Sequence, residues 1–414
     1  MSKPHDRREF LERLGVGAAG LMAAGYTGTA RGYAANETLN VGCIGTGGRT
    51  QMLMRSLEGI QGVRLTAVCD IWDQHLEAGK QLADPKAATT KDFRELLGRK
   101  DVDAVIIGSP DHWHVPMTVE ACAAGKDVYV EKPLTHDLSE GAAVIEAQNQ
   151  HQRIVQVGTQ QRSMPQFQKA YEIITSGRLG PVYKVHLSWN RNAPRWTRSD
   201  YGVKLSPAEW KQFLGSAKDQ PFDGYKFRQW RWFWDFGGGM LTDLMVHYID
   251  VVHWIMKVDH PQLATTIGDN FATAGLWETP DTVQTLMQYP DRKFQAHFES
   301  TFVNAHEANR LEFMCADGTL YLDRGRYEIH PEPKRKVKAE EYVLGEGPRG
   351  KDFYDNPHGE RLHLANWIEC IRSRKKPNCP AEAGVSAASA AHLANRALRS
   401  GSVARWKDVS VAKA

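Results

Sequence analysis

The chain has 414 residues, which exceeds what one compact core usually holds and suits two domains. With 42% hydrophobic residues, 24% charged residues and a formal net charge of +3, it is neither a disordered chain nor one with a basic field for nucleic acid. Its six cysteines include no CxxC pair and no Cys/His set with zinc spacing, so we expect neither a metal site nor a disulfide framework.

Residues 1–35 have the order of an export signal. Arg7 and Arg8 precede Phe10 and Leu11, an apolar Gly/Ala-rich stretch follows, and small residues near residue 35 offer a cleavage site. The paired arginines resemble the twin-arginine signal, which carries folded proteins across the bacterial inner membrane. We therefore expect a periplasmic protein. Because the apolar stretch is too short to span a bilayer, we expect no membrane anchor.

Residues 36–160 alternate apolar runs with helical stretches, a pattern that predicts βαβ units around a parallel sheet. The expected strands are 39–44, 63–69, 104–107, 127–130 and 154–157, with a helix at 115–124. These elements predict an α/β Rossmann domain that binds a dinucleotide.

A glycine-rich turn, Gly45-Thr46-Gly47-Gly48-Arg49, lies between the first strand and a helix expected to begin near Gln51. Such a turn lets the backbone approach a pyrophosphate at the positive end of the helix. Asp70, which ends the second strand, can accept hydrogen bonds from ribose hydroxyls and would repel a 2′-phosphate. The expected cofactor is therefore NAD rather than NADP. Thr50 stands where the fingerprint has its third glycine, a departure that bears on helix–strand packing but leaves the phosphate site in place.

Several segments resemble the glucose–fructose oxidoreductase, inositol dehydrogenase and MocA family, written Gfo/Idh/MocA. They are the glycine turn, residues 109–114, Glu131-Lys132-Pro133, and Gly237-Gly238-Gly239 with the later Asp243, His247 and Asp250. The aromatic run at residues 230–234 is similar to that of exported members. The resemblance implies a second α+β domain at residues 161–414, with a mostly antiparallel open sheet that often forms the subunit contact, and hence a dimer or tetramer.

The resemblance also implies hydride transfer between a sugar or polyol carbon and the nicotinamide. Because the periplasm offers little free dinucleotide, we expect an exported enzyme to hold this cofactor tightly. The expected cofactor-binding residues are Gly45, Gly47, Gly48, Arg49, Asp70, Ser109, His114, Glu131 and Lys132. His114 and Ser109 are included because they match family positions that line the cofactor.

Oxidation of a secondary alcohol needs a base for the hydroxyl proton beside the ring that accepts the hydride. Lys132 follows a strand end, where ligands bind in such sheets. Asp243 and His247 are four residues apart on an expected helix, so they share one face, and Asp250 is placed to orient the histidine. The glycines at 237–239 should let the chain approach the nicotinamide. In the family, the matching histidine is the usual acid/base, and the matching lysine and aspartate orient the hydroxyl.

Substrate contacts are less sharply indicated. Arg162, in a polar run after the last Rossmann strand, is placed to meet sugar hydroxyls, although such runs are often only surface. Trp230 and Trp232 are candidate sugar platforms, and burial in the second domain explains them equally well. The remaining chain predicts helices at 166–176, 242–256, 358–372 and 381–400, strands at 182–189, 282–289, 294–301, 310–315 and 319–322, and a surface loop at 331–356.

Three functions are compatible with these sequence features. The leading one is a periplasmic sugar or polyol oxidoreductase. The second is a redox-neutral NAD-dependent glycosidase or lyase that acts through a transient keto sugar. The third is a sugar-binding or dinucleotide-sensing protein without catalysis, which the intact Lys132, Asp243 and His247 disfavour.

Overall fold

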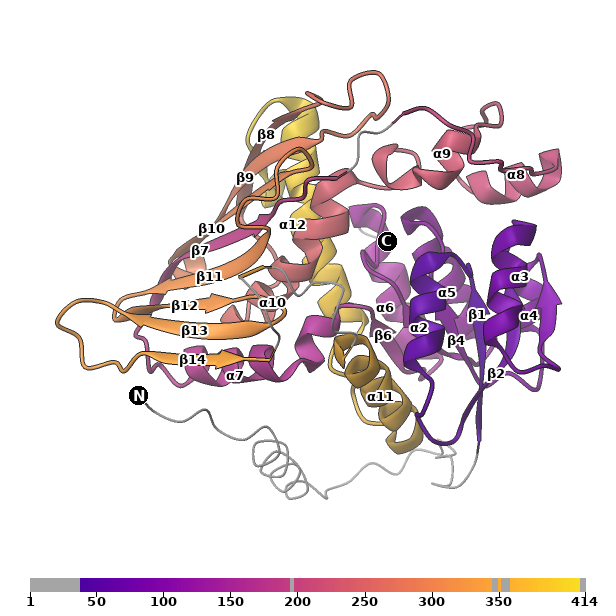
Figure 1. The fold of residues 1–414 in the computed structure, drawn as a ribbon, viewed down its shortest axis with the longest axis horizontal. Coiled ribbons are helices and arrows are strands. Elements are labelled where there is room, and N and C mark those ends of the chain that lie inside the picture. The colour runs from indigo at the N-terminus through magenta and orange to yellow at the C-terminus, as the bar shows by residue number, and fades with distance from the viewer. Residues whose placement is uncertain (1–37, 194–196, 345–348, 351–357, 410–414) are drawn as a thin grey trace. The chain divides into compact units, whose positions relative to one another are not determined.

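The computed structural model describes residues 38–193, 197–344, 349–350 and 358–409 (Figure 1). The predicted export signal at residues 1–35 lies outside the described residues. The described chain forms two β-sheets, each with its own helices.

The first sheet has six parallel strands in the order β3-β2-β1-β4-β5-β6, the strand order of a doubly wound dinucleotide-binding fold. Strands β4 and β5 are fully buried because helices cover both faces, which explains their continuous apolar sequence. The elements are β1 (Leu39–Ile44), α2 (Gly48–Ser56), β2 (Val63–Cys69), α3 (Asp73–Leu82), β3 (Ala88–Thr90), α4 (Phe93–Leu97), β4 (Ala104–Ile107), α5 (His114–Ala123), β5 (Asp127–Val130), α6 (Gly141–Gln150) and β6 (Val155–Val157).

The second sheet has nine strands in the order β14-β13-β12-β11-β7-β10-β9-β8-β15. Strands β7 and β10 pair in parallel, and the other neighbours are antiparallel, as expected of the second domain. The strands are β7 (Val182–Trp189), β8 (Leu263–Asp269), β9 (Thr282–Tyr289), β10 (Phe294–Thr301), β11 (Asn309–Cys315), β12 (Gly318–Leu322), β13 (Arg326–Pro331), β14 (Glu340–Val343) and β15 (Ala404–Arg405).

Strand β14 lies inside the stretch predicted to be a surface loop, so that prediction was wrong there. Its sequence is charged, with Glu340 and Glu341, because it stands at the edge of the sheet and, among the described strands, pairs only with β13. Charged side chains are common on edge strands, where they oppose pairing with other chains.

Three helices pack against one face of the second sheet: α7 (Pro165–Thr175), α10 (Val246–Met256) and α12 (Ala381–Ser400). Their core includes Phe167, Tyr248 and Phe313, which are fully buried. Side chains that alternate with the core positions point to the opposite face, where Leu286 and Ile267 are 53% and 70% exposed.

Helix α11 (His358–Ser373) joins the core of the first sheet, although it lies far beyond the expected boundary at residue 160. Leu364, Trp367 and Ile371 are fully buried in one cluster with Leu39 and Val41 of β1. The chain therefore returns to the Rossmann domain after building the second sheet. Among the described helices, none is long and apolar enough to cross a membrane.

Candidate active site

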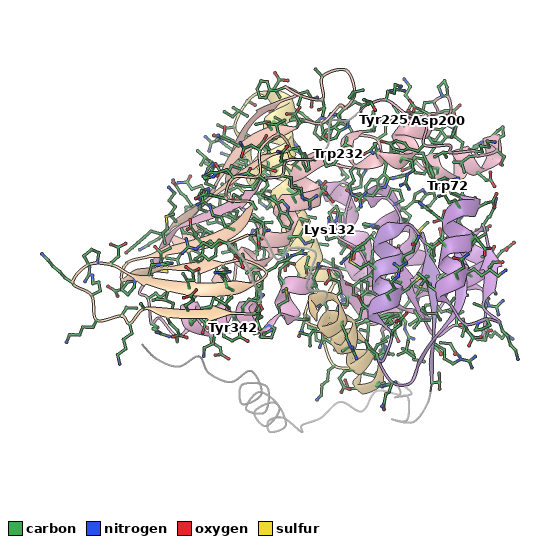
Figure 2. The ribbon with its side chains drawn as sticks, viewed as in Figure 1. Trp72, Lys132, Asp200, Tyr225, Trp232 and Tyr342 are labelled. Atoms are coloured by element: carbon green, nitrogen blue, oxygen red, sulfur yellow. The ribbon has the colours of Figure 1, made fainter. Side chains whose placement is uncertain are left out.

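Two adjoining cavities, of about 300 and 540 Å³, lie along the carboxyl ends of the Rossmann strands. Both are lined by Gly48, Arg49 and Ser109, so they meet at the glycine turn. The smaller one contains Asp70, and the larger one contains Lys132. Figure 2 places Lys132 between the Rossmann elements and the second sheet.

The glycine turn has the backbone geometry that a pyrophosphate requires. Gly45 has φ +75°, and a Cβ there would lie 2.8 Å from the backbone nitrogen of Ser109. A Cβ at Gly48, the first residue of α2, would meet nothing within 4 Å, so the space in front of the helix N-terminus is free. The hydroxyl of Ser109 and one guanidinium nitrogen of Arg49 are buried and have no hydrogen-bond partner among the residues that the structure describes. These features fit a dinucleotide phosphate.

Thr50 does not loosen the helix–strand contact. Its hydroxyl donates to the carbonyl of Gly45 at 2.5 Å and lies against Gly108, where a Cβ would come within 2.0 Å of the Thr50 oxygen. The glycine that allows close packing is therefore Gly108, at the end of the neighbouring strand β4.

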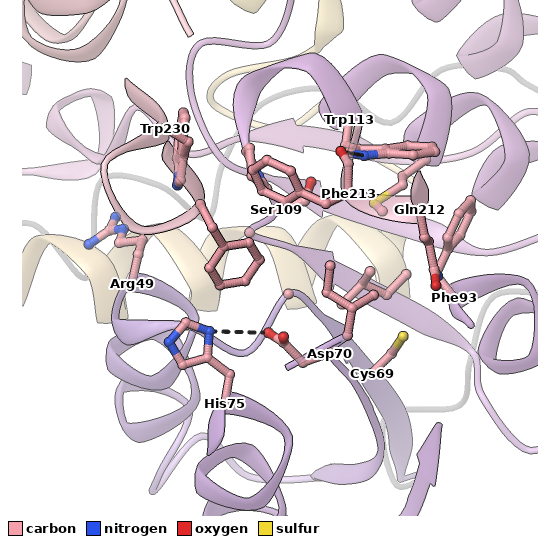
Figure 3. A pocket seen from close by; sticks show the side chains of 18 of the residues that line it. Arg49, Cys69, Asp70, His75, Phe93, Ser109, Trp113, Gln212, Phe213 and Trp230 are labelled. Carbon is pink, nitrogen blue, oxygen red and sulfur yellow. Dashed lines mark hydrogen bonds and ion pairs between the residues drawn. The ribbon is translucent and has the colours of Figure 1, made fainter. Parts of the chain in front are cut away.

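Asp70 faces the smaller cavity, close to His75 (Figure 3). Its carboxylate is fixed by the backbone amides of Thr46, at 2.8 Å, and Trp72, at 2.9 Å. A carboxylate held at this strand end can accept hydrogen bonds from the ribose of NAD.

A segment from the second half of the chain covers the smaller cavity: α8 (Pro207–Leu214) and α9 (Gly224–Arg228). The Phe213 carbonyl accepts from the indole of Trp113 and bonds the ring of His112, at 2.9 and 2.8 Å. Lys91 forms an ion pair with Glu209 at 2.7 Å. This α8–α9 segment therefore encloses the space that the adenosine half of the dinucleotide would occupy.

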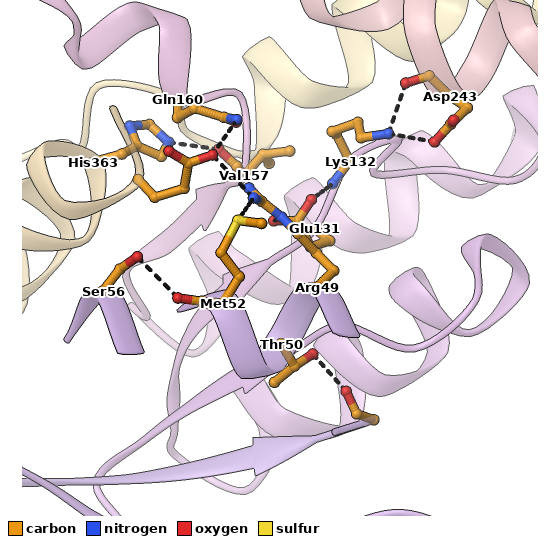
Figure 4. A network of polar contacts seen from close by, with 12 residues as sticks. Arg49, Thr50, Met52, Ser56, Glu131, Lys132, Val157, Gln160, Asp243 and His363 are labelled. Carbon is orange, nitrogen blue, oxygen red and sulfur yellow. Dashed lines mark hydrogen bonds and ion pairs between the residues drawn. The ribbon is translucent and has the colours of Figure 1, made fainter. Parts of the chain in front are cut away.

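Arg49 lies between two carboxylates in the larger cavity (Figure 4). It bonds Glu131 at 2.8 Å and Glu360, from α11, at 3.0 Å. Glu131 reaches this position because Gly158 has no side chain; a Cβ there would lie 2.8 Å from the carboxylate. Gln160 also bonds Glu360, at 3.0 Å, and lines the cavity.

Lys132 and Asp243 form an ion pair in the same cavity. The ammonium donates to the Asp243 Oδ1 at 2.8 Å and to its backbone carbonyl at 2.7 Å, and Arg231 reaches Oδ1 at 3.2 Å. Burial would raise the pKa of Asp243, but Lys132 and Arg231 outweigh it and hold the pKa far below its usual value. Among the described residues, the hydrogen bonds from both cations go to Oδ1 and none goes to Oδ2.

His247 lines the larger cavity with Lys132 and Asp243, so the structure brings the three predicted catalytic residues together. A π-turn at Leu241–Met245 precedes α10 where a regular helix was expected, and such bulges are frequent at functional sites. The imidazole stacks on Trp189 with ring centroids 5.2 Å apart, and its Nδ1 is buried with no hydrogen-bond partner in the described part of the chain. Burial, followed by Lys132 and nearby arginines, lowers the pKa of His247 well below 6.5, so it is neutral at pH 7.

Two sequence expectations fail together in the structure. Asp250 does not orient His247; both of its oxygens bond Arg162, at 2.8 Å each. Arg162 is buried in this pair and lines neither cavity, so it is removed from the substrate site. Periodicity alone did not reveal the pair, because the two residues are 88 positions apart.

The glycines at 237–239 were expected to let the chain approach the nicotinamide. In the structure they instead allow neighbouring parts of the protein to pack closely. A Cβ at Gly237 would lie 3.0 Å from the Cα of Arg231, and one at Gly239 would lie 2.7 Å from Thr279.

His114 lines the larger cavity as expected, and its ring nitrogens lie 2.6 and 2.9 Å from the carbonyls of Pro133 and Ser109.

Trp230 lines both cavities, with the guanidinium of Arg231 4.2 Å above its ring centroid. Trp232 also lines the larger cavity but is 7% exposed and stacks on Trp277. Several arginines of the larger cavity were missed from the sequence, because they lie on loops, on a short turn or at the end of α9 without a motif; they are Arg191, Arg228, Arg231 and Arg324.

A group of three possible metal ligands, His186, His297 and Glu299, lies on the second sheet, away from these cavities. The guanidinium of Arg310 is 3.1 Å from His186 and 3.7 Å from Glu299. Because this side chain already supplies the positive charge, we assign no metal to the group.

Models of the two domains of one oxidoreductase family, GFO/IDH/MocA, match the chain. The NAD-binding Rossmann model matches residues 39–159, and the C-terminal domain model matches residues 167–321. Levoglucosan dehydrogenase, in complex with NADH and levoglucosan, superposes with a TM-score of 0.69 at 16% identity, covering 89% of this chain and 99% of that one. That structure shares the fold.

Three curated relatives show how far the sequence similarity extends. YrbE of Bacillus subtilis, an uncharacterised oxidoreductase, is 24% identical over 377 residues, 87% of this chain and 94% of that protein. Inositol 2-dehydrogenase of Salmonella typhimurium is 28% identical over 225 residues, 54% of this chain and 56% of that protein. An α-N-acetylgalactosaminidase of Tannerella forsythia is 37% identical over 143 residues, 29% of this chain and 31% of that protein.

Proposed function

Because the chain belongs to the Gfo/Idh/MocA oxidoreductase family, we propose that it transfers hydride between a secondary hydroxyl of a sugar or polyol and a tightly held NAD. One observation carries the proposal: Lys132, Asp243 and His247 line a single cavity that adjoins the glycine turn. Gly48, Arg49 and Ser109 would hold the pyrophosphate, and Asp70 the adenosine ribose. When bound, NAD accepts the hydride from the substrate carbon.

The chain's own residues handle the proton. The neutral imidazole of His247 accepts it from the substrate hydroxyl as the carbonyl forms, and returns it in the reverse direction. Lys132 donates a hydrogen bond to the same oxygen, and Asp243, held ionised by its two cations, accepts from a neighbouring hydroxyl. Trp230 offers an aromatic face for the sugar ring.

The test begins with the purified protein and no added cofactor. Denaturation should release about one NAD per chain, and the folded protein should oxidise members of a polyol panel, including myo-inositol, to ketones when an electron acceptor regenerates NAD. Absence of both released and rebound dinucleotide would contradict the proposal. Bound NAD without oxidation of any polyol, aldose or anhydrosugar would contradict the reaction assigned to it.

The redox-neutral alternative is favoured by one finding, the 37% identity to the α-N-acetylgalactosaminidase over 143 residues. An enzyme of that kind would cleave an aryl glycoside without an acceptor. The proposed oxidoreductase would leave the glycoside intact and form a ketone only when an acceptor is present.

Two further parts of the proposal concern the cellular location and the oligomeric state of the enzyme. The twin-arginine pattern at residues 1–35 supports export to the periplasm after folding with NAD. The exposed apolar side chains of the second sheet, Leu286 and Ile267, support a homo-oligomer formed through that face. Fractionation of cells tests the location, and light scattering of the purified protein tests the oligomeric state.

A further inference from the structure

The larger cavity of the candidate active site has a positively charged lining. Burial lowers the pKa of both lining histidines, His114 and His247, below 6.5, so they add no charge at pH 7. Among the described residues, the lining has six cationic side chains and three carboxylates, which gives it a net charge of +3. The cations are Arg49, Lys132, Arg191, Arg228, Arg231 and Arg324, and the carboxylates are Glu131, Asp243 and Glu360.

Bound NAD would offset only part of this positive charge, because its positive nicotinamide ring partly cancels its negative pyrophosphate. A cleft lined mostly by one sign of charge attracts a ligand of the opposite sign. The lining therefore favours a substrate that carries a negative charge of its own.

Two of the six cations, Arg191 and Arg324, line the larger cavity but not the smaller one. Arg191 follows the end of β7, and Arg324 follows the end of β12. Strand β11 lies between β7 and β12 and is antiparallel to both, so these two strands end at the same edge of the sheet. The second sheet therefore places both arginines in the part of the site that is separate from the space for adenosine.

Both arginines lie beside the predicted base. The guanidinium carbons of Arg191 and Arg324 are 5.8 and 5.5 Å from the ring centroid of Trp189, the last residue of β7. The imidazole of His247 stacks on the same indole, with ring centroids 5.2 Å apart. After burial and Lys132, the two arginines are among the cations that lower the pKa of His247. Two guanidiniums and the base thus surround one indole in the cavity where the hydroxyl would be oxidised.

The carboxylates of the same cavity limit how much negative charge a substrate can bring. Burial would raise the pKa of Glu360, but Arg49 and then Arg324 outweigh it and keep this carboxylate ionised. Asp243 is ionised as well, with Lys132 as its first cation. Because like charges repel at short range, a group with one negative charge fits this site better than a phosphate monoester with two.

We propose that the substrate of this site is a sugar acid, whose carboxylate binds Arg191 and Arg324 while His247 faces the hydroxyl that is oxidised. This inference rests on the proposed function and narrows its substrate class. Guanidiniums bind a carboxylate through charge-assisted hydrogen bonds, which a hydroxymethyl group in the same place cannot match. In the reaction the carbinol carbon gives its hydride to NAD and the hydroxyl gives its proton to His247. The product is a keto acid with an unchanged carboxylate.

The experiment compares acids with their neutral partners on the NAD-loaded protein, with an electron acceptor present. D-Glucuronate, D-galacturonate and D-gluconate are paired with D-glucose, D-galactose and D-glucitol, which have a hydroxymethyl group in place of the carboxylate. Glucose 6-phosphate tests a group with a second negative charge. Arg191→Gln and Arg324→Gln each remove one positive charge, and Arg324→Lys keeps it. The matched control is Arg399→Gln, because Arg399 also lies on an indole, that of Trp234 at 5.0 Å, but does not line the cavity.

We expect at least one acid to be oxidised with a kcat/KM about tenfold or more above that of its neutral partner. Arg191→Gln and Arg324→Gln should each raise KM for that acid about tenfold and change kcat/KM for the neutral partner less than about twofold. Arg324→Lys should recover part of the loss, and Arg399→Gln should behave as the wild type. The NAD content and thermal midpoint of each variant show that it is folded.

Equal or faster oxidation of the neutral partners by the wild type overturns this inference and leaves the proposed function in place. Preference for glucose 6-phosphate over all three acids overturns the choice of a carboxylate. Equal losses for acid and neutral substrates in both glutamine variants would mean that the arginines act only on the structure, and would also overturn it. Oxidation of none of these compounds, nor of any neutral polyol, contradicts the proposed function itself.

Discussion

His247 combines the properties that a base for a sugar hydroxyl requires. It is neutral at pH 7 because burial and nearby cations disfavour its charged form, and the indole of Trp189 fixes the plane of its ring. Asp250, the partner that sequence spacing favoured, is bonded to Arg162. The ring is thus oriented by stacking, and a proton can leave or enter without competition from a carboxylate partner.

Replacement of His247 by alanine should lower the rate of polyol oxidation by about 10²–10⁴-fold, since positioned acid–base groups contribute that much. NAD should remain bound, because the residues of the glycine turn are untouched. Single-turnover absorbance at 340 nm measures the rate, and the nicotinamide released on denaturation measures occupancy. A normal rate at full occupancy would show that another group is the base.

Thr50 and Gly108 provide a second test at the level of single residues. Gly108→Ala should cost about 1–3 kcal/mol of stability, because the new Cβ would lie 2.0 Å from the Thr50 hydroxyl oxygen. In a Thr50→Ala background that oxygen is gone, and the same change should cost much less. The thermal midpoints of the wild type, the two single variants and the double variant give the coupling free energy between the two positions. Additive effects of the two changes would mean that the contact does not limit the packing of α2 on β4.

Among the elements, the α8–α9 segment lines the smaller cavity, where the adenosine of NAD is expected to bind. Lys91→Met and Trp113→Phe each remove a contact between this segment and the Rossmann domain, and each should speed the release of NAD by about 2–5-fold. Gel filtration with timed assay of retained dinucleotide measures the loss. Glu120→Gln, which breaks the exposed pair with Arg94, is the matched control and should release NAD at the wild-type rate.

The sequence predicted those helices and strands that a short stretch of chain marks by its apolar pattern or by its turn residues. Strands β1, β2, β4 and β5 begin and end where the pattern placed them. The signal is plainest in β4, whose sequence is a continuous apolar run because the strand is buried throughout. Strand β14 was missed because an edge strand is stabilised by pairing and carries no apolar pattern. The π-turn before α10 was missed because its side chains have the same spacing as a helix.

The residues of the candidate site also differ in whether a local sequence pattern could reveal them. Lys132, Asp243 and His247 could be named from motifs, and the structure brings them to one cavity. Glu360, Arg191 and Arg324 reach that cavity from distant segments, through tertiary packing that no local pattern encodes.

At the scale of the whole molecule, buried neutral histidines connect stability to pH. Burial lowers the pKa of His112 and of His363 to about 4, whereas the unfolded value is about 6.5. Below pH 6.5 the unfolded chain therefore binds protons that the folded chain does not, and stability falls until about pH 4. Each histidine should cost about 1.4 kcal/mol by pH 5.5.

Scanning calorimetry at pH 7.5, 6.5 and 5.5 tests this dependence. The unfolding midpoint should change little between the first two values and fall clearly by the third. His112→Asn and His363→Asn should each flatten the fall. A midpoint that does not change down to pH 5.5 would show that these rings are not held neutral by burial.

The central claim is that a nicotinamide ring lies in the larger cavity, against Lys132, Asp243 and His247. A crystal structure of the protein with NAD tests it without knowledge of the substrate. We expect the pyrophosphate at the amides of Gly47 and Gly48, the adenosine ribose at Asp70, and the nicotinamide in the cavity with the three head groups. A dinucleotide whose nicotinamide end lies outside that cavity, with the three side chains facing protein or solvent, would contradict the account.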